Sequence, residues 1–383
     1  MSNRCHSRPR VLINGVSARQ GGGLTILRSL TSAIGEAESL ACEYHVVCTD
    51  STSELLHGSR NLKLIHVSAS MSSLVGQYRF YRKALPEIVS TTSVDVVFNL
   101  ADAIPHLSCP QVYYFDWAYL VCSDARVWSK LSLAERLYRR LKSAAIAANI
   151  GEVSAAIAQN ELMRERLQML APNVRVDVVP PLVQLPRKLP VRAWERHIQL
   201  LCLSHYAPHK NLWLLVDLAK LLKAQKESVS ISVTVNEAGC TFARRFSREI
   251  RRQQLTDYII PIGPVGPSDL RKTVARHHAL LIPSLLESFG LTYFEAMSFG
   301  RTVIAADTEY ARAACGDAAF YFRPCDASDA LLHIQLARES IGIRSQRLAI
   351  GLEIAKQFPR VDVSMRCLDQ LMFEIAANQE MMP

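Results

Sequence analysis

The stretch that decides the fold is Ala279-Leu-Leu-Ile-Pro-Ser-Leu-Leu-Glu-Ser-Phe-Gly-Leu-Thr-Tyr-Phe-Glu-Ala-Met-Ser-Phe-Gly300. Its first four residues are an apolar run, which predicts a short buried strand. The segment after Gly290 contains Ala, Met and Phe at spacings that predict a helix. The chain is therefore expected to form a strand, a turn and a helix N-terminus in direct succession.

The turn before this helix is suited to bind an anion. The first backbone N–H groups of a helix have no partners inside it, and the aligned peptide dipoles place partial positive charge there. A phosphate is the most plausible anion at such a position. Gly290 lets the backbone approach the ligand closely, and the hydroxyl of Ser288 adds a hydrogen-bond donor.

Two carboxylates border the same turn. Glu287 lies in the turn and Glu295 lies about two helical turns beyond it, so that both can face one cleft. Carboxylates repel a phosphate, and their presence is explained if they accept hydrogen bonds from neighbouring hydroxyl groups. A phosphate flanked by hydroxyl-rich rings is a nucleotide sugar. The alternative is that Glu287 caps the helix and Glu295 is a solvated helix residue.

The whole segment resembles the Glu-x7-Glu signature of retaining glycosyltransferases of the GT-B class, family 4, also described as glycosyl transferases group 1. The resemblance implies two doubly wound, Rossmann-like parallel-sheet domains that face each other across a cleft. It assigns Glu287 to hydroxyls of the transferred sugar, Glu295 to the nucleotide ribose, and the backbone from Phe289 to Leu291 to the phosphates. The matching positions are Pro283, Glu287, Phe289, Gly290, Leu291, Glu295, Ala296, Met297, Gly300, Val303 and Ile304.

A second matching segment, Ser204-His-Tyr-Ala-Pro-His-Lys-Asn211, follows the strand predicted at 198–203. In the family, an Arg and a Lys five residues later neutralise the diphosphate. Lys210 and Asn211 match that pattern, but His205 stands at the Arg position. A guanidinium binds two oxygens with a fixed charge, whereas an imidazole offers one donor whose charge depends on pH. Without the resemblance, Lys210 would be interpreted as a solvated loop lysine.

The resemblance also locates the nucleotide base. The family packs the base after the third strand of this domain, where the present chain has Gly263-Pro-Val265. Gly263 and Val265 are therefore expected to contact the donor.

The chain as a whole alternates strand-like and helix-like stretches, which predicts parallel sheets covered by helices on both faces. The predicted domains are 1–185, an acceptor-side Rossmann-like domain, and 195–360, a nucleotide-sugar-binding one. The remainder, 361–383, is predicted as a helix that packs back on the N-terminal domain. The predicted strands are 11–13, 44–48, 62–67, 94–99, 111–115, 151–158, 174–179, 198–203, 231–235, 259–262, 279–282 and 303–306.

The first domain contains a glycine-rich segment, Asn14–Gly23, that is predicted to be a loop before a helix beginning at Leu24. Three consecutive glycines favour a tight turn or a close approach to a ligand. In the resembling family, a Gly-Gly loop after the first strand faces the donor phosphates and the acceptor, which implicates Gly21, Gly22 and Gly23. The alternative is a flexible connection.

Asp102 and Asp116 follow predicted strands of the first domain and are candidate cleft residues, because ligands of parallel sheets lie beyond the carboxyl ends of the strands. Many relatives carry a His just after such a strand, beside the reacting sugar. Here Phe115 and Asp116 stand at that place. The acid–base residue therefore stays open, with Asp116 the nearest candidate and His106 a weaker one.

Composition limits the class of protein. The chain has 383 residues, of which 49% are hydrophobic, enough for two domains with separate cores. No apolar run reaches the roughly 18 residues of a membrane-spanning helix, and the first residues lack the apolar core of a signal peptide, so we expect a cytosolic protein. Ten cysteines are scattered without a Cys-x-x-Cys pair, which indicates neither a zinc site nor a disulfide framework.

The formal net charge of +9 suggests an anionic partner: nucleic acid, an anionic membrane or a phosphorylated substrate. No recognisable nucleic-acid module supports the first of these. Two basic segments contain aromatic residues, Gln77–Lys83 and Trp128–Lys142. The second segment predicts either an interfacial helix on anionic lipid or an ordinary surface helix. Its apolar side is predicted to comprise Leu131, Leu133, Leu137, Tyr138 and Leu141, with Arg136, Arg139, Arg140 and Lys142 largely elsewhere.

The resemblance, together with these patterns, implies a retaining hexosyltransferase, peripheral on the cytoplasmic face of the inner membrane, that builds a bacterial surface polysaccharide such as O-antigen or capsule. The expected partners are a nucleoside diphosphate sugar donor and a saccharide or lipid-linked saccharide acceptor. No cofactor or metal is expected, because Lys210 and the helix N-terminus suit the leaving diphosphate and the chain lacks the Asp-x-Asp triplet of metal-dependent sugar transfer. The alternatives are a GT-B nucleotide-sugar epimerase, a transferase with a soluble acceptor, and a binding module without catalysis.

Overall fold

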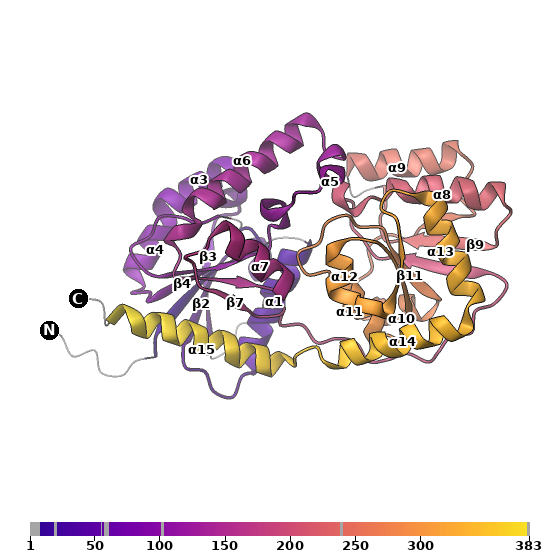
Figure 1. Ribbon diagram of the computed structural model, residues 1–383. Helices are drawn as coiled ribbons and strands as arrows, with labels where there is room; N and C mark the ends of the chain where they lie inside the picture. The colour runs from indigo at the N-terminus through magenta and orange to yellow at the C-terminus, as the bar shows by residue number, and fades with distance from the viewer. Residues whose placement is uncertain are drawn as a thin grey trace. The chain divides into compact units, whose positions relative to one another are not determined.

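The computed structural model describes residues 8–18, 21–54, 56, 61–100, 103–237 and 240–380. The chain divides into two compact units (Figure 1). The first unit comprises Met1–Val121, Leu137–Gln184 and Pro359–Pro383, and the second comprises Cys122–Arg136 and Leu185–Phe358. The segment Cys122–Arg136, which lies inside the predicted N-terminal domain in sequence, thus groups with the second unit.

The first unit is built on a parallel sheet of seven strands among the described residues, in the order β3-β2-β1-β4-β5-β6-β7. The order reverses between β1 and β4, which is the topological switch point of a doubly wound fold. The strands are β1 (Arg10–Asn14), β2 (Glu43–Thr49), β3 (Leu62–Val67), β4 (Val96–Asn99), β5 (Gln111–Tyr114), β6 (Ala155–Ala158) and β7 (Val176–Val178). The helices in the same part of the chain are α1 (Gly21–Glu36), α2 (Asp50–Ser53), α3 (Leu74–Arg79), α4 (Leu85–Thr91), α6 (Leu133–Asn149), α7 (Glu161–Leu170) and α15 (Val361–Glu380).

The second unit repeats this architecture with six parallel strands in its described part, in the order β10-β9-β8-β11-β12-β13. Its order reverses between β8 and β11. The strands are β8 (Ile198–Cys202), β9 (Val229–Val233), β10 (Ile259–Pro261), β11 (Ala279–Ile282), β12 (Thr302–Ala306) and β13 (Ala319–Phe322). The helices are α5 (Ala125–Ser129), α8 (Trp213–Ala224), α9 (Thr241–Arg252), α10 (Pro267–Ala275), α11 (Leu291–Ser298), α12 (Glu309–Cys315), α13 (Ala327–Glu339) and α14 (Ile341–Lys356).

Both sheets are buried on both faces, as parallel sheets require. In β1, Val11 and Ile13 pack into one apolar core with α1 and α15, while Leu12 packs into the core on the opposite face with α4. In the second unit, one face packs against α8, α9 and α13 and the other against α10, α11, α12 and α14. The α/β class and the two Rossmann-like parallel sheets predicted from the sequence are therefore confirmed.

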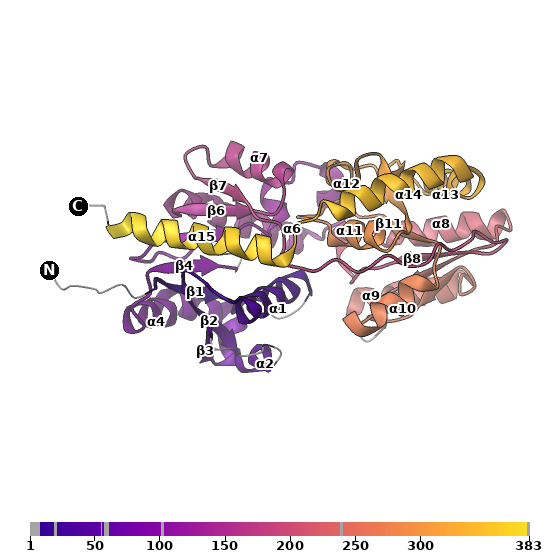
Figure 2. The same ribbon diagram turned by 90° about the horizontal axis from the view of Figure 1, so that it is seen from below.

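The last helix, α15, closes the core of the first unit. Figure 2 shows it lying across the strands close to α1. Its buried Asp369 accepts hydrogen bonds from the Ala41 N–H at 2.6 Å and from the Tyr44 hydroxyl at 2.8 Å. A buried carboxylate requires hydrogen-bond partners, and these bonds supply them. They therefore fix the position of α15 on the sheet.

Several local predictions need correction. The Gly21–Gly23 segment is the first turn of α1 and not part of the preceding loop, so the helix begins three residues earlier than predicted. Leu131 is buried in the turn between α5 and α6 and is not on the apolar side of α6. The predicted strand 151–158 begins only at Ala155, because a 3-10 turn covers Ile150–Glu152. The edge strand β13 was missed, since four residues carry too little periodicity to be noticed.

The helix α6 starts at a capping box. The Ser132 backbone N–H and hydroxyl donate to Glu135 Oε2 at 3.0 and 2.8 Å. The Glu135 N–H donates back to Ser132 Oγ at 3.3 Å. These bonds satisfy backbone groups that a helix N-terminus otherwise leaves unpaired. Across the described residues, no helix combines the length and the apolar character needed to cross a bilayer.

Candidate functional site

The two segments singled out in the second half of the chain follow adjacent parallel strands. Ser204–Asn211 follows β8, and Pro283–Gly290 follows β11. These strands pair with Leu200 opposite Ala279, at the point where the strand order of the sheet reverses. In doubly wound sheets the ligand lies at this switch point, beyond the carboxyl ends of the strands. The topology therefore brings the two segments together.

At the centre of this site, Lys210 and Glu287 form an ion pair. Lys210 Nζ lies 2.7 Å from Glu287 Oε1 and 2.8 Å from Oε2, so the ammonium contacts both carboxylate oxygens. The two side chains are only 15% and 14% exposed. A backbone hydrogen bond of 2.8 Å from the Leu285 N–H to the His209 carbonyl joins the two loops beside the pair. In the free protein, each charge thus neutralises the other in a shielded position.

Asn211 fixes the loop immediately after Lys210. Its backbone is left-handed, with φ of 52° and ψ of 36°, a conformation that Asn adopts more readily than most residues. The side chain is 2% exposed and its Nδ2 donates to Cys325 Sγ at 3.7 Å. Its Oδ1 is buried without a hydrogen-bond partner among the described residues. The turn Pro208–Lys210 is therefore held at the start of α8 by a buried side chain.

His205 lies exposed in the same loop. Loss of hydration around its ring, and then the positive charge of Lys210, lower the pKa of this imidazole, while Glu287 acts in the opposite direction. His205 is accordingly neutral at neutral pH. The fixed positive charge of this loop comes from Lys210, and His205 contributes at most one neutral donor.

The turn after β11 leads into α11 as predicted. Gly290 precedes the helix in the left-handed conformation, with φ of 78°, and Phe289 is buried while Ser288 and Leu291 are half-buried. A Cβ atom at Gly290 would lie 2.5 Å from Cδ2 of the buried Tyr293. Only glycine fits this position, and it leaves the N-terminal N–H groups of α11 facing the turn.

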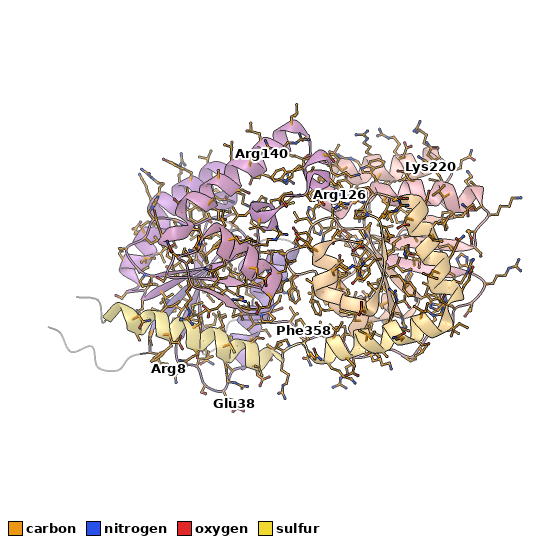
Figure 3. All side chains as sticks on the ribbon, viewed as in Figure 1. Arg8, Glu38, Arg126, Arg140, Lys220 and Phe358 are labelled. Atoms are coloured by element: carbon orange, nitrogen blue, oxygen red, sulfur yellow. The ribbon has the colours of Figure 1, made fainter. Side chains whose placement is uncertain are left out.

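Aromatic packing supports this turn from behind. The rings of Phe289 and Phe294 are stacked with centroids 4.7 Å apart, and Phe358 contacts both edge-on at 5.9 and 5.4 Å. Phe358, labelled in Figure 3, is the last residue of the second unit. The conformation of the Phe289 backbone therefore depends on a residue far along the chain.

Glu295 is half-buried on α11, and burial raises the pKa of its carboxyl from 4.5 to about 7. The folded protein thus holds this proton between about pH 4.5 and 7, where the unfolded chain has lost it. Stability consequently falls as the pH rises through this range, and the full cost of the buried charge, on the order of 3 kcal/mol, is present above pH 7.

The raised pKa of Glu295 predicts the behaviour of Glu295→Gln. The amide does not ionise, so the variant is expected to be more stable than the natural protein at pH 8 by up to about 3 kcal/mol, with the difference vanishing near pH 4.5. Urea unfolding at a series of pH values measures this difference. An equal advantage at pH 5 and pH 8 would show that the effect comes from packing and not from the ionised carboxylate.

The other residues of this unit that were predicted to contact the donor also lie beyond the carboxyl ends of the strands. Gly263 follows β10 with φ of 77°, and a Cβ atom there would lie 3.6 Å from Asn236 Nδ2. Val265 is half-buried just before α10. Because β10 is the edge strand and β9 separates it from β8, this loop lies two strands away from the Lys210 loop.

The candidates from the first half of the chain belong to the first unit. Gly22 and Gly23 lie in the first turn of α1, after β1. Asp116 follows β5, and its Oδ1 accepts a hydrogen bond of 3.0 Å from Nε2 of the buried Gln159. His106 is exposed, with Nδ1 2.7 Å from Glu152 Oε2. Asp102 lies outside the described residues.

Sequence reasoning missed a buried polar chain at the switch point of the first unit. Asn14 Nδ2 donates to Asn99 Oδ1 at 3.0 Å, and Asn99 Nδ2 donates to Gln111 Oε1 at 2.9 Å. All three side chains are buried, and Asn14 Oδ1 has no partner among the described residues. The signal was present in the sequence, because Asn14 directly follows one predicted strand and Asn99 ends another.

A comparison with protein families finds a match in the second unit. Residues 190–343 match the family described as glycosyl transferases group 1. The match lies within the second unit, covers less than half of the chain, and includes both Lys210 and Glu287. The match confirms the resemblance of this region to glycosyl transferases group 1. A search of curated protein sequences found no match.

Solved structures share the fold over nearly the whole chain. Sucrose-phosphate synthase from Thermosynechococcus elongatus superposes with a TM-score of 0.75 at 13% identity, covering 97% of this chain and 100% of that one. HepE (Alr3699) of Anabaena, solved with UDP and glucose, gives 0.68 at 15% identity, covering 96% and 100%. The lipopolysaccharide outer core galactosyltransferase WaaB gives 0.61 at 14% identity, covering 97% and 100%. The predicted GT-B fold is thus confirmed.

Proposed function

We propose that the protein is a retaining glycosyltransferase of the family 4 type, which moves a sugar from a nucleoside diphosphate donor to a saccharide acceptor without a metal ion. The observation that carries this proposal is the shielded Lys210–Glu287 pair at the switch point beside the N-terminus of α11. The match of residues 190–343 to glycosyl transferases group 1 supports the same assignment.

The pair suggests how the donor binds. A diphosphate entering the site competes with Glu287 for the ammonium of Lys210, since phosphate and carboxylate oxygens attract the same cation. Glu287, freed from Lys210, then accepts hydrogen bonds from hydroxyls of the transferred sugar. The N–H groups of Phe289, Gly290 and Leu291, with the Ser288 hydroxyl, hold the phosphates.

The remaining proposed donor contacts follow from where each residue lies beyond the carboxyl ends of the strands. Glu295 accepts hydrogen bonds from the ribose hydroxyls, which favour its charged form over the protonated form that burial favours. Gly263 and Val265 contact the base, and His205 and Asn211 line the Lys210 loop. From the first unit, Gly22 and Gly23 approach the phosphates and Asp116 approaches the reacting sugar.

In the reaction, the acceptor oxygen bonds to the anomeric carbon while the bond from that carbon to the diphosphate oxygen breaks on the same face. The acceptor proton passes to the departing diphosphate oxygen. The developing negative charge on that oxygen is stabilised by Lys210 and by the N-terminus of α11. No protein nucleophile takes part, and Asp116 has an orienting role.

The biological setting is also a proposal: a peripheral protein on the cytoplasmic face of the inner membrane that extends a lipid-linked saccharide for O-antigen or capsule. HepE was solved with UDP and with UDP-glucose, which makes a UDP-sugar the first donor to test. WaaB is described as a lipopolysaccharide outer core galactosyltransferase, which supports a surface polysaccharide as the acceptor.

A thermal-shift screen tests the donor site. We expect one of UDP, GDP, ADP, CMP and dTDP to raise the melting temperature, equally with magnesium and with EDTA, because a ligand that binds only the folded state stabilises it by mass action. Stabilisation only with magnesium would contradict the metal-independent assignment. No shift across the whole panel would contradict the donor site and favour a non-catalytic binding module.

A further inference from the structure

The helix α6 presents its apolar side to solvent. Leu133, Leu137 and Leu141 are 81%, 60% and 63% exposed, and Tyr138 is 48% exposed. The helix α6 is one of the longer helices of the protein (Figure 1); its first turn, up to Arg136, groups with the second unit and the rest with the first. An amphipathic helix of a globular protein normally turns such residues toward its core.

Two cationic side chains of α6 take the opposite orientation. The Arg139 guanidinium lies over the ring of Tyr119 at 4.9 Å, and the Lys142 ammonium lies over the ring of Trp117 at 3.6 Å. Both residues are half-buried, beside the fully covered Ile146. Cation–π contacts therefore hold the helix against the protein, and its leucines lie mostly outside the core.

The outward face is continuous. At about 100° per residue, Leu133, Leu137, Leu141 and Tyr138 span an arc of about 140°. Every residue that falls inside this arc, including the alanines between them, is apolar and exposed. Arg140 lies beside one edge of the arc. Near the other edge, Lys142 has its ammonium over the Trp117 ring. Arg140, labelled in Figure 3, is itself exposed.

We infer that α6 docks on the surface of an anionic phospholipid bilayer. An apolar arc with an exposed cation beside it is the pattern of a helix that lies in the membrane plane, with its apolar face among the acyl chains and Arg140 at the headgroups. A second copy of the chain is a poorer occupant, because two such faces would bring their bordering arginines together. The net charge of +9 adds long-range attraction to an anionic surface.

The inference deepens the proposed function, on which it rests for its biological meaning, by naming the surface that the enzyme would contact. Vesicle binding needs neither donor nor acceptor, so its outcome is independent of the donor-site tests. A failed nucleotide screen together with strong vesicle binding would reject the enzyme and keep the docking helix.

Vesicle co-sedimentation tests the inference. The full chain is expected to bind vesicles of phosphatidylcholine mixed with phosphatidylglycerol at low salt, to bind about tenfold more weakly at high salt, and to bind phosphatidylcholine alone weakly. The triple change Leu133→Gln, Leu137→Gln and Leu141→Gln is expected to weaken binding about tenfold or more, since it removes the apolar face but no charge. Arg140→Gln is expected to reduce binding mainly at low salt.

A matched control is available in the second unit. Leu332, Leu336 and Ile341 are 56%, 37% and 67% exposed on α13 and α14, and their triple change to Gln is expected to leave vesicle binding unchanged. Thermal unfolding checks that each variant is folded. Equal binding by the α6 triple variant and the natural protein would overturn the inference. A natural dimer that the α6 changes convert to a monomer would overturn it too, by showing that a second copy covers this face.

Discussion

Replacing Lys210 by alanine is expected to slow sugar transfer about a thousandfold, and replacing Glu287 by alanine is expected to have an effect of similar size. Lys210 and Glu287 form an ion pair. In the proposed mechanism, Lys210 stabilises the leaving diphosphate and Glu287 accepts hydrogen bonds from the sugar. Release of the nucleoside diphosphate in the presence of donor and acceptor measures the rate. Near-normal turnover by either variant would contradict the site assignment.

The same pair gives a second readout that separates catalysis from folding. Each single change leaves a mostly shielded charge without its partner, so each variant is expected to lose about 2 kcal/mol of stability. The double variant removes both charges and is expected to recover part of that loss while remaining inactive. Denaturant unfolding of the four proteins tests this. Recovery of activity in the double variant would show that the pair acts only through stability.

A lysine on α8 serves as the control. Lys220, labelled in Figure 3, is exposed and pairs with Asp217 at 3.1 Å on the helix surface. Lys220→Ala removes the same charge from the same unit, but a surface pair contributes little to stability. Its activity and stability are expected to match those of the natural protein.

Replacing Gly290 by alanine is expected to lower the free energy of unfolding by about 2 to 4 kcal/mol. The added Cβ would lie 2.5 and 2.7 Å from two ring carbons of Tyr293, which is fully buried and cannot swing away. The backbone at φ of 78° also disfavours any residue with a Cβ. Because the same backbone forms the turn before α11, the stabilisation by nucleoside diphosphate is expected to fall as well.

Gly342 provides the matched comparison for this change. It lies exposed near the start of α14, and a Cβ atom there would meet nothing within 4 Å. Gly342→Ala is expected to leave stability unchanged or slightly increased, because alanine favours the helix. If Gly290→Ala were as stable as Gly342→Ala, the left-handed turn would not be required at this position.

Much of the fold was predictable because both sheets are parallel and doubly covered. Their strands are short apolar runs, such as Ala279–Ile282, that stand out between helical stretches. The pattern was weaker at the sheet edge, where β13 was missed, and at helix starts such as Gly21, where glycine suggested a loop. Local composition does not distinguish a glycine in a first helical turn from one in a loop.

The candidate site was predictable for a different reason. Glu287, Gly290 and Glu295 stand within one short segment, so their spacing on a turn and a helix follows from helix geometry alone. Lys210 is far from them in sequence, and only the resemblance connected it to Glu287. The structure joins them because β8 and β11 are neighbours in the sheet. The raised pKa of Glu295 depends on burial and has no local signal.

The sequence by itself predicted most of the strands, the turn at Gly290 before the helix, and a candidate anion site at that turn, since each depends on neighbours within a few positions. Only the tertiary structure decided which of these residues meet and which helix faces are covered. The periodicity of α6 was evident from its sequence, but its orientation was not. An apolar stripe indicates that a helix has two sides, while the direction of each side depends on the packing of Arg139 and Lys142 against rings elsewhere in the chain.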